Sequence, residues 1–207
     1  MIVIIDYGMG NTGSLENMIR KVGGDSIISS DPEIIKDAEK LVLPGVGSFD
    51  NGIELLNHVN LVSILNYKVK EEKVPILCIC LGAHLIANSS EEGKLKGLGW
   101  IDASVIKFRF NSEDLNKLRI PHMGWNDVSI TKQSLLFENM PNNPSFYFVH
   151  SYHLECNDPS DILSKSVYGY EFVSAVEKEN IFATQFHPEK SHKYGMQLIR
   201  NFVDKVC

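Results

Sequence analysis

The chain has 207 residues, of which 43% are hydrophobic and 22% are charged, which is ordinary for one soluble globular domain with a sizeable core. Its formal net charge is -6, and lysine and arginine are scattered along the sequence, so the composition does not support binding to nucleic acid or to an anionic membrane. No apolar run approaches the roughly eighteen residues of a membrane span. We therefore expect small molecules or other proteins as partners.

Two features of the sequence indicate a cytoplasmic protein. The four cysteines lack the regular spacing of a disulfide framework, which predicts free thiols in a reducing compartment. The apolar start, residues 1–5, is followed by an aspartate and has neither a basic segment before it nor a small-residue cleavage site. It therefore predicts a first strand rather than a signal peptide.

The first half of the chain alternates short strands with short helices. Strands are predicted over residues 1–6, 26–29, 40–43 and 74–80, and helices over residues 15–22, 32–38, 53–56, 61–69 and 81–86. Alternation with short connections is typical of a parallel sheet that helices cover on both faces. We therefore predict an α/β fold with an open, mostly parallel sheet.

The second half of the chain is richer in strands. Short β-prone runs divided by turn residues lie at 103–108, 127–130, 145–149, 162–168, 172–176 and 181–185, and we expect this part to be partly antiparallel. An amphipathic pattern over residues 196–206 predicts a last helix that packs on the sheet. Neither a repeat nor a linker divides the chain, so we predict a single domain over residues 1–207.

An apolar run that ends in Cys80 predicts a nucleophile elbow. Pro75 opens the run, Gly82 follows the cysteine by two residues, and Leu81 and Leu85 have helical spacing. A buried strand that turns sharply into a helix here places the sulfur at the carboxyl edge of the sheet and beside a helix N-terminus, which favours the thiolate. The motif is unspecific on its own, because a cysteine in an apolar strand more often only packs.

The segment 185–191 supplies a histidine and a carboxylate two residues apart. Pro188 favours an extended backbone for the residue before it, in which His187 and Glu189 project to the same side. Glu189 can then hold the imidazole of His187, which can accept the thiol proton of Cys80 and later protonate a leaving group. A surface loop with a helix-capping glutamate is the alternative.

A glycine-rich turn at residues 44–47 suits the stabilisation of an oxyanion. It follows a predicted strand, and the backbone N–H groups of Gly45, Val46 and Gly47 can be aimed at a developing negative charge. The N–H of Leu81, next to the cysteine, is the expected second donor. Glycines at strand ends also serve as simple turn residues, so this motif too is unspecific alone.

The first loop offers a different chemistry. Gly8, Gly10 and Gly13 form a Gly-x-Gly-x-x-Gly pattern between a strand and a helix, and Asp31 follows at about the spacing of a ribose-binding acid. This pattern supports an alternative function, a dinucleotide-binding oxidoreductase. The other interpretation is that these glycines only let the chain turn and the helix pack closely.

Six segments of the chain stand in the order found in one protein family. They are residues 5–11, 43–47, 75–85, 121–126, 148–152 and 185–191. Together they resemble the class I glutamine amidotransferases, and within them the glutaminase subunits of imidazole glycerol phosphate synthases, almost from end to end. Each segment alone is weak, but six ordered matches do not arise by coincidence.

The resemblance implies a catalytic triad with Cys80 as nucleophile, His187 as general base and Glu189 as its orienting acid. It implies hydrolysis of L-glutamine to glutamate and ammonia through a cysteine thioester, with no cofactor and no metal. The residues that it places at the oxyanion and around bound glutamine are Gly45, Val46, Gly47, Leu81, His84, His150, Ser151 and Tyr152.

The resemblance also implies a protein partner. The ammonia is expected to pass into a cyclase or synthase subunit with a (β/α)8 barrel, bound as a heterodimer, in histidine biosynthesis. The residues expected at or near that interface are Asn11, Met123, Trp125, Asn126 and Lys190. The glycines of the first loop then belong to a partner-facing turn rather than to a pyrophosphate site.

Three residues near the elbow differ from the family pattern. Members usually have glycine at the position of Cys78, methionine at that of Ala83 and glutamine at that of His84. Cys78 adds volume where the turn is tight, and a neutral histidine has one donor and one acceptor where the family uses a carboxamide to hold glutamine. We expect the triad to be retained and leave the affinity for glutamine open.

Three further interpretations stay open. Cys78 and Cys80 lie two residues apart on a strand and could face one way to bind a metal with a histidine such as His84, although metal sites normally have two-residue gaps between cysteines. Residues 13–18 and the altered elbow also resemble paralogous glutaminase subunits that supply ammonia to a sugar amidotransferase of surface polysaccharide synthesis. The third is an inactive scaffold subunit that keeps the triad.

Overall fold

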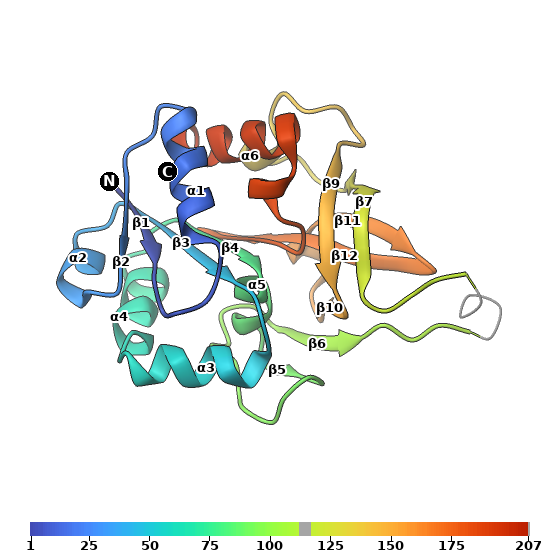
Figure 1. The fold of residues 1–207 in the computed structure, drawn as a ribbon, viewed down its shortest axis with the longest axis horizontal. Helices are drawn as coiled ribbons and strands as arrows, with labels where there is room; N and C mark the ends of the chain where they lie inside the picture. Colours follow the sequence, from blue (N-terminus) through green and yellow to red (C-terminus); the bar gives the residue numbers. More distant parts are fainter. Residues whose placement is uncertain (112–116, 207) are drawn as a thin grey trace.

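The computed structural model describes residues 1–111 and 117–206 and shows an α/β fold built on one large sheet (Figure 1). The centre of this sheet is parallel. Its strands stand in the order β2 (Ser26–Ser29), β1 (Ile2–Ile5), β3 (Lys40–Gly45), β4 (Ile76–Cys80) and β13 (Ile181–Thr184). The predicted α/β fold with an open, mostly parallel sheet is confirmed.

The second half of the chain continues the sheet. From β13 the order is β12 (Tyr170–Lys178), β10 (Tyr152–Cys156), β6 (Ala103–Lys107) and β5 (Ser89–Ser90), while β11 (Ile162–Tyr168) pairs with β12 and with β8 (Ser129–Ile130). These pairs are antiparallel, except that β5 is parallel to β6. A separate antiparallel pair is formed by β7 (His122–Asp127) and β9 (Ser145–His150). The expected antiparallel character is therefore confirmed.

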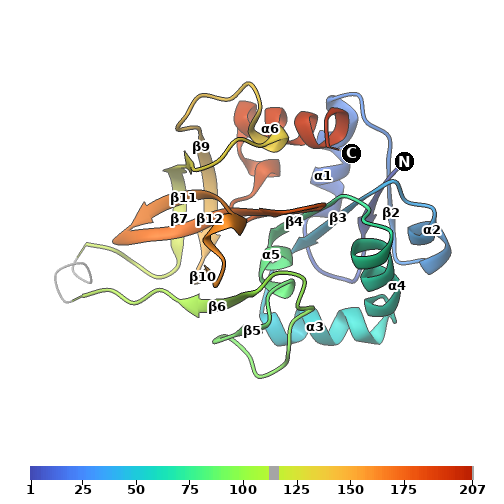
Figure 2. The same ribbon diagram turned by 180° about the vertical axis from the view of Figure 1, so that it is seen from behind.

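Helices cover both faces of the parallel strands, as the view from behind shows (Figure 2). One face carries α1 (Thr12–Lys21) and α6 (His192–Asp204), and the other carries α3 (Phe49–His58), α4 (Val62–Asn66) and α5 (Leu81–Leu85). The shorter turns of helix are α2 (Pro32–Lys36), η1 (Tyr67–Glu71), η3 (Leu135–Phe137), η4 (Pro159–Asp161) and η5 (Pro188–Lys190). Across residues 1–111 and 117–206, none of the helices has the length and apolar character to cross a membrane.

The apolar core is divided by the sheet into two layers. Along β1, Ile2 and Ile4 pack with α1 and α6, whereas Val3 and Ile5 pack on the side of α3. This alternation follows from the period of two of a strand. All four residues are buried, because helices cover both faces of these strands.

The sequence pattern does not predict the end of β3, most of β7 or any of β10. The pattern predicts that β3 ends at residue 43, but β3 continues to Gly45, which pairs with Cys80. It also predicts no strand over residues 122–126 or 152–156, where most of β7 and all of β10 lie. Histidines and a glycine interrupt the apolar alternation in these two segments. The segments are strands because β7 pairs with β9 and β10 pairs with β6 and β12.

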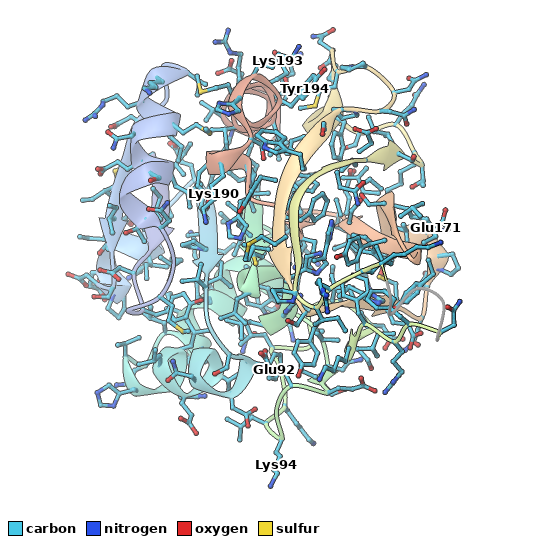
Figure 3. All side chains as sticks on the ribbon, turned by 45° about the vertical axis from the view of Figure 1, so that its right-hand side comes forward. Glu92, Lys94, Glu171, Lys190, Lys193 and Tyr194 are labelled. Atoms are coloured by element: carbon cyan, nitrogen blue, oxygen red, sulfur yellow. The ribbon has the colours of Figure 1, made fainter. Side chains whose placement is uncertain are left out.

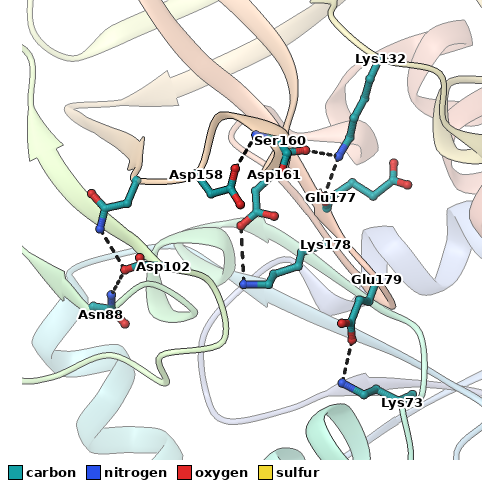
Figure 4. A network of polar contacts seen from close by, with 11 residues as sticks. Lys73, Asn88, Asp102, Lys132, Asp158, Ser160, Asp161, Glu177, Lys178 and Glu179 are labelled. Carbon is teal, nitrogen blue, oxygen red and sulfur yellow. Dashed lines mark hydrogen bonds and ion pairs between the residues drawn. The ribbon is translucent and has the colours of Figure 1, made fainter.

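A polar network joins the chain before β11 to the end of β12 (Figure 4). Nζ of Lys132 donates to the carbonyl oxygens of Ser160 at 2.7 Å and Glu177 at 2.8 Å. The buried carboxylate of Asp161 lies 3.7 Å from Nζ of Lys178. These contacts stabilise the antiparallel part of the sheet, and none of the five residues lines the cavity described below.

Candidate active site

The strand β4 passes into α5 through a strained turn at Cys80. The backbone of Cys80 has φ 54° and ψ -107°, a conformation that residues with a side chain rarely adopt. Two glycines make room for it: a Cβ on Gly82 would collide with the carbonyl oxygen of Leu43, and one on Gly45 would lie 2.8 Å from the nitrogen of Gly82. The local geometry is that of the elbow expected from the sequence.

The turn also separates Cys80 from Cys78. Cys78 packs in the core layer of α3 and α5, whereas Cys80 belongs to the layer of α1 and α6. Burial raises the pKa of the Cys78 thiol, which keeps it protonated. Because the two sulfurs face opposite sides, the interpretation of these cysteines as paired metal ligands is wrong. Within the described ranges, no three His, Cys, Asp or Glu side chains are grouped so as to hold a metal.

His187 and Glu189 form a buried hydrogen bond. Nδ1 of His187 lies 2.8 Å from Oε1 of Glu189, and both side chains are almost fully buried. The backbone of His187 is extended, but Glu189 lies in the tight turn η5. The expectation that a continuous extended segment brings the two side chains together is therefore wrong, and the turn does so instead. Oγ of Ser191 donates to the carbonyl oxygen of His187 at 2.6 Å and holds this turn.

The ring of His187 connects Glu189 to Cys80. Its Nε2 has no nitrogen or oxygen partner among the residues that the structure describes and interacts with the thiol of Cys80. Burial disfavours the charged ring, but the hydrogen bonds with Cys80 and Glu189 outweigh burial and raise the pKa of His187 to about 9. The ring is therefore charged at neutral pH, which is the state that can protonate a leaving amine.

The substitution Glu189→Gln tests this coupling. Loss of a carboxylate beside the imidazolium removes a favourable charge, so the pKa of His187 should fall from about 9, by about one to three units. Titration of the ring by nitrogen NMR measures the change. A pKa that stays near the parent value in the folded variant would contradict the role of Glu189.

A cavity of about 280 Å³ opens in front of Cys80. This volume is just below the range of pockets for drug-sized ligands, so the cavity suits one small metabolite. Gly45, expected at the oxyanion, does not line it, because it lies inside β3 opposite Cys80. The lining residues are Val46, Gly47, Cys80, Leu81, His84, Glu92, Pro121, Val149, His150, Ser151, Tyr152 and His187.

His84 reaches Cys80 through a second side chain. Its Nε2 lies 2.8 Å from Oε1 of Gln185, and Nε2 of Gln185 lies 4.0 Å from Sγ of Cys80. Since Oε1 can only accept, Nε2 of His84 carries a proton. Burial lowers the pKa of His84 to about 4, so the ring is neutral. This contact of Gln185 was not predicted, because nothing in the sequence pairs it with His84.

Glu92 is a cavity residue that no sequence motif indicated. Its Oε2 accepts the backbone N–H of Phe49 at 2.9 Å, and burial raises its pKa. In Figure 3, Glu92 and Lys190 lie on either side of α5. The one available signal was a pair of acidic residues, 91 and 92, shortly after the elbow helix. Glu92 therefore adds an acidic residue to the wall of a cavity that Cys80 also lines.

The sequence and the fold both match one family. The sequence profile of the family Glutamine amidotransferase class-I matches residues 3–206. The chain belongs to this family. A protein of Methanococcus maripaludis named imidazole glycerol phosphate synthase subunit HisH 2 is 57% identical over 206 residues, which cover 100% of both chains. A protein of Pseudomonas aeruginosa with the same name is 46% identical over 206 residues, again 100% of both chains.

Solved structures share the fold of this class I glutamine amidotransferase. The structure of PurLQS from Thermotoga maritima has a TM-score of 0.69 at 18% identity, over 98% of this chain and 97% of that chain. The crystal structure of a glutamine amidotransferase from the same organism has a TM-score of 0.63 at 16% identity, over 98% of this chain and 82% of that chain. At these identities the likeness concerns the fold alone.

The first loop of the amidotransferase does not have the features of a dinucleotide site. Asp31, the expected ribose ligand, caps α2 by accepting the N–H of Glu33 at 2.9 Å. A Cβ on Gly13 would meet no atom within 4 Å, so close packing does not require a third glycine there. A Cβ on Gly10 would lie 2.8 Å from Pro44, so the loop packs on β3. The alternative of a dinucleotide-binding oxidoreductase is wrong.

Three residues expected at a partner interface of the amidotransferase are accessible. Met123 and Trp125 are 62% and 48% exposed. The ring of Trp125 stacks on His192, with 5.2 Å between ring centres, and Nζ of Lys190 lies 5.9 Å from the centre of the Tyr147 ring. An exposed tryptophan held by a stacked neighbour is a typical anchor of protein interfaces.

The two asparagines predicted at the interface differ from each other. Asn11 is exposed at the start of α1, and its side chain makes no capping hydrogen bond there. The amide of Asn126 is turned inward, where Nδ2 donates to the carbonyl oxygen of Val167 at 2.9 Å. The side chain of Asn11 is therefore accessible to a partner, whereas the amide of Asn126 already makes a hydrogen bond within the protein.

Proposed function

We propose that this amidotransferase is the glutaminase subunit of an imidazole glycerol phosphate synthase, and that it hydrolyses L-glutamine to glutamate and ammonia for histidine biosynthesis. The observation that carries the proposal is the contact of His187 with Cys80 on one side and Glu189 on the other. Cys80 and His187 line the same cavity. Relatives that match over the full chain and carry the name of that subunit support it.

The arrangement of these three side chains determines the order of the proton transfers in the proposed reaction. His187 holds the proton taken from the thiol of Cys80 while Sγ attacks the amide carbon of glutamine. The charged ring then gives this proton to the departing nitrogen, which leaves as ammonia. The glutamyl group stays on the sulfur as a thioester. A water molecule then loses a proton to His187 and attacks the thioester, which breaks the C–S bond, releases glutamate and restores Cys80 beside a protonated His187. Glu189 keeps the ring in the orientation that both proton transfers need.

The turn after β3 supplies the oxyanion donors. Val46, Gly47 and Leu81 line the cavity, and their backbone N–H groups can stabilise the negative charge on the substrate oxygen. Gly47 has φ 115°, and the side chain of Val46 is 44% exposed. The turn lies at the surface, so a bound partner can set its orientation.

Glu92 and His84 are the groups proposed for recognition of the amino-acid end of glutamine. The carboxylate of Glu92 can bind the α-ammonium group, and Glu92 is the one acidic residue among the described residues that line the cavity. Nε2 of His84 already donates to Gln185, so His84 offers the substrate only Nδ1 as an acceptor. This is one polar group where the family's carboxamide has two.

We further propose a cyclase subunit with a (β/α)8 barrel as the partner. The exposed apolar side chains of Val46, Met123 and Trp125 are suited to contact it, and ammonia passes from the cavity of Cys80 into its active site. A cytoplasmic location fits a reaction that requires a reduced cysteine, and Cys78, Cys80 and Cys156 are free thiols.

Glutamine hydrolysis by the subunit alone and with the cyclase subunit tests this function. The subunit alone should be slower by at least about a hundredfold, because one misplaced oxyanion donor costs that much in kcat. Full turnover without a partner, unchanged by the cyclase, would contradict the proposal. Stimulation by a sugar-modifying synthase but not by the cyclase would point to the polysaccharide alternative.

A further inference from the structure

A chain of hydrogen bonds runs from β7 to the wall of the glutamine cavity. Nδ2 of Asn126 lies 3.3 Å from Nε2 of His122, Nδ1 of His122 lies 2.9 Å from Nε2 of His150, and Nδ1 of His150 lies 2.7 Å from the carbonyl oxygen of Tyr152. His150 and Tyr152 line the cavity. The two histidines are buried and lie opposite each other in the β7–β9 pair.

The groups at the two ends of this series of hydrogen bonds determine which atoms donate and which accept. The carbonyl oxygen of Tyr152 can only accept, so Nδ1 of His150 carries a proton. At the other end, Oδ1 of Asn126 accepts the N–H of Asp127 at 2.9 Å, which identifies Nδ2 as the NH2 group that faces His122. Asn126 therefore donates and Tyr152 accepts.

The two rings between these ends have one arrangement that satisfies every contact. Burial lowers the pKa of His122 to about 4 and that of His150 well below its usual value, so each ring is neutral and carries one proton. With Nδ1 of His150 protonated, its Nε2 must accept from Nδ1 of His122. Nε2 of His122 must then accept from Asn126. Both histidines are in the Nδ1–H form.

Packing prevents the ring of His122 from turning away. It stacks between Phe148 and Tyr168, with ring centres 4.9 and 4.1 Å away. His122 and Asn126 lie on the inner face of β7, whereas Met123 and Trp125 project outward from the same strand. One strand thus carries proposed partner contacts on one side and contacts to the cavity wall on the other.

We propose that Asn126, His122 and His150 form a one-way hydrogen-bond relay, in which His122 is a positioning residue that couples the partner-facing strand β7 to the glutamine cavity. The functional part of this inference rests on the proposed glutaminase activity. The relay holds His150 in one tautomer and thereby holds the bend from β9 to β10 at Ser151, which forms part of the cavity wall.

Substitutions at His122 test the functional part in the complex with the cyclase subunit. His122→Phe keeps the stacked ring but leaves Nε2 of His150 without a donor, so the KM for glutamine should rise about tenfold or more, with a smaller change in kcat. His122→Asn keeps a donor at the position of Nδ1 and should restore most of the loss. His153→Phe is the matched control, since it also removes a buried histidine, and its KM should stay near the parent value. Equal KM values in His122→Phe and the parent, or equal losses in His122→Phe and His153→Phe, would overturn the coupling.

The tautomers can be measured without any activity. Nitrogen NMR of histidine-labelled protein should show the Nδ1–H form for both His122 and His150. Asn126→Asp places an acceptor opposite Nε2 of His122 and should add a proton to that nitrogen, which gives a doubly protonated ring if the contact with His150 is kept. A parent protein with His150 in the Nε2–H form, or an unchanged His122 in Asn126→Asp, would overturn the relay. If both tautomers are as expected but no cyclase stimulates glutamine hydrolysis, the relay stands and the proposed function fails.

Discussion

Replacement of Cys80 by serine should abolish glutamine hydrolysis and leave the fold intact. Serine differs by one atom and can occupy the same turn, but its hydroxyl is a far weaker nucleophile than the sulfur of Cys80 beside His187. We expect kcat for glutamate formation to fall by about four orders of magnitude or more. The measurement is glutamate release by the complex with the cyclase subunit at saturating glutamine.

Two controls separate the loss of the nucleophile from a general loss of structure. The Cys80→Ser complex should still use added ammonia, because the cyclase site does not depend on the sulfur. Cys78→Ala alters the neighbouring cysteine of the same strand, which faces the opposite core layer, and should lose about 1–2 kcal/mol of stability but keep its turnover. Loss of ammonia use in Cys80→Ser, or equal loss of turnover in both variants, would contradict a nucleophilic role for Cys80.

Gly82→Ala should have the largest effect on stability. A Cβ at this position collides with the carbonyl oxygen of Leu43, and backbone atoms of the central sheet cannot yield as the end of a side chain does. Overpacking of this kind costs about 3 kcal/mol, which for a chain of this size lowers the Tm by about 6–12 °C. Thermal unfolding followed by circular dichroism measures the change. Glutamine turnover should fall with it, because the elbow must shift.

Gly13→Ala is the matched control for this substitution. Gly13 lies in the first turn of α1, and a Cβ there meets no atom within 4 Å. An alanine in a helix is at least as favourable as glycine, so the Tm should stay level or rise slightly. A Gly82→Ala protein with the parent Tm would show that the elbow can relax and that the tight approach of β3 to α5 is not required.

Much of the site could be predicted because its signals are local. The apolar run before Cys80 and the glycine after it define an elbow within a few residues. His187 and Glu189 are neighbours in sequence, so their pairing was predicted, although the turn that achieves it was taken for an extended segment. The alternation of strands and helices in the first half indicated a parallel sheet for the same reason.

The parts that could not be predicted depend on contacts between distant segments. Gln185 meets His84 across 101 positions of the chain, and Glu92 meets Phe49 across 43. The strand β7 contains a histidine, a glycine and an asparagine, so it lacks the apolar alternation by which a strand is recognised in a sequence. Its strand character comes from pairing with β9, and propensity gives no measure of that pairing.

In the proposed mechanism, Cys80 carries the glutamyl group of glutamine during turnover. The most direct measurement is peptide mass spectrometry of the complex, quenched in acid while it hydrolyses glutamine. The proposed mechanism predicts one glutamyl group on the peptide that contains Cys80, sensitive to hydroxylamine as a thioester is. Glutamate production at the full rate with no such adduct, or with the adduct on Cys78 or Cys156, would contradict it.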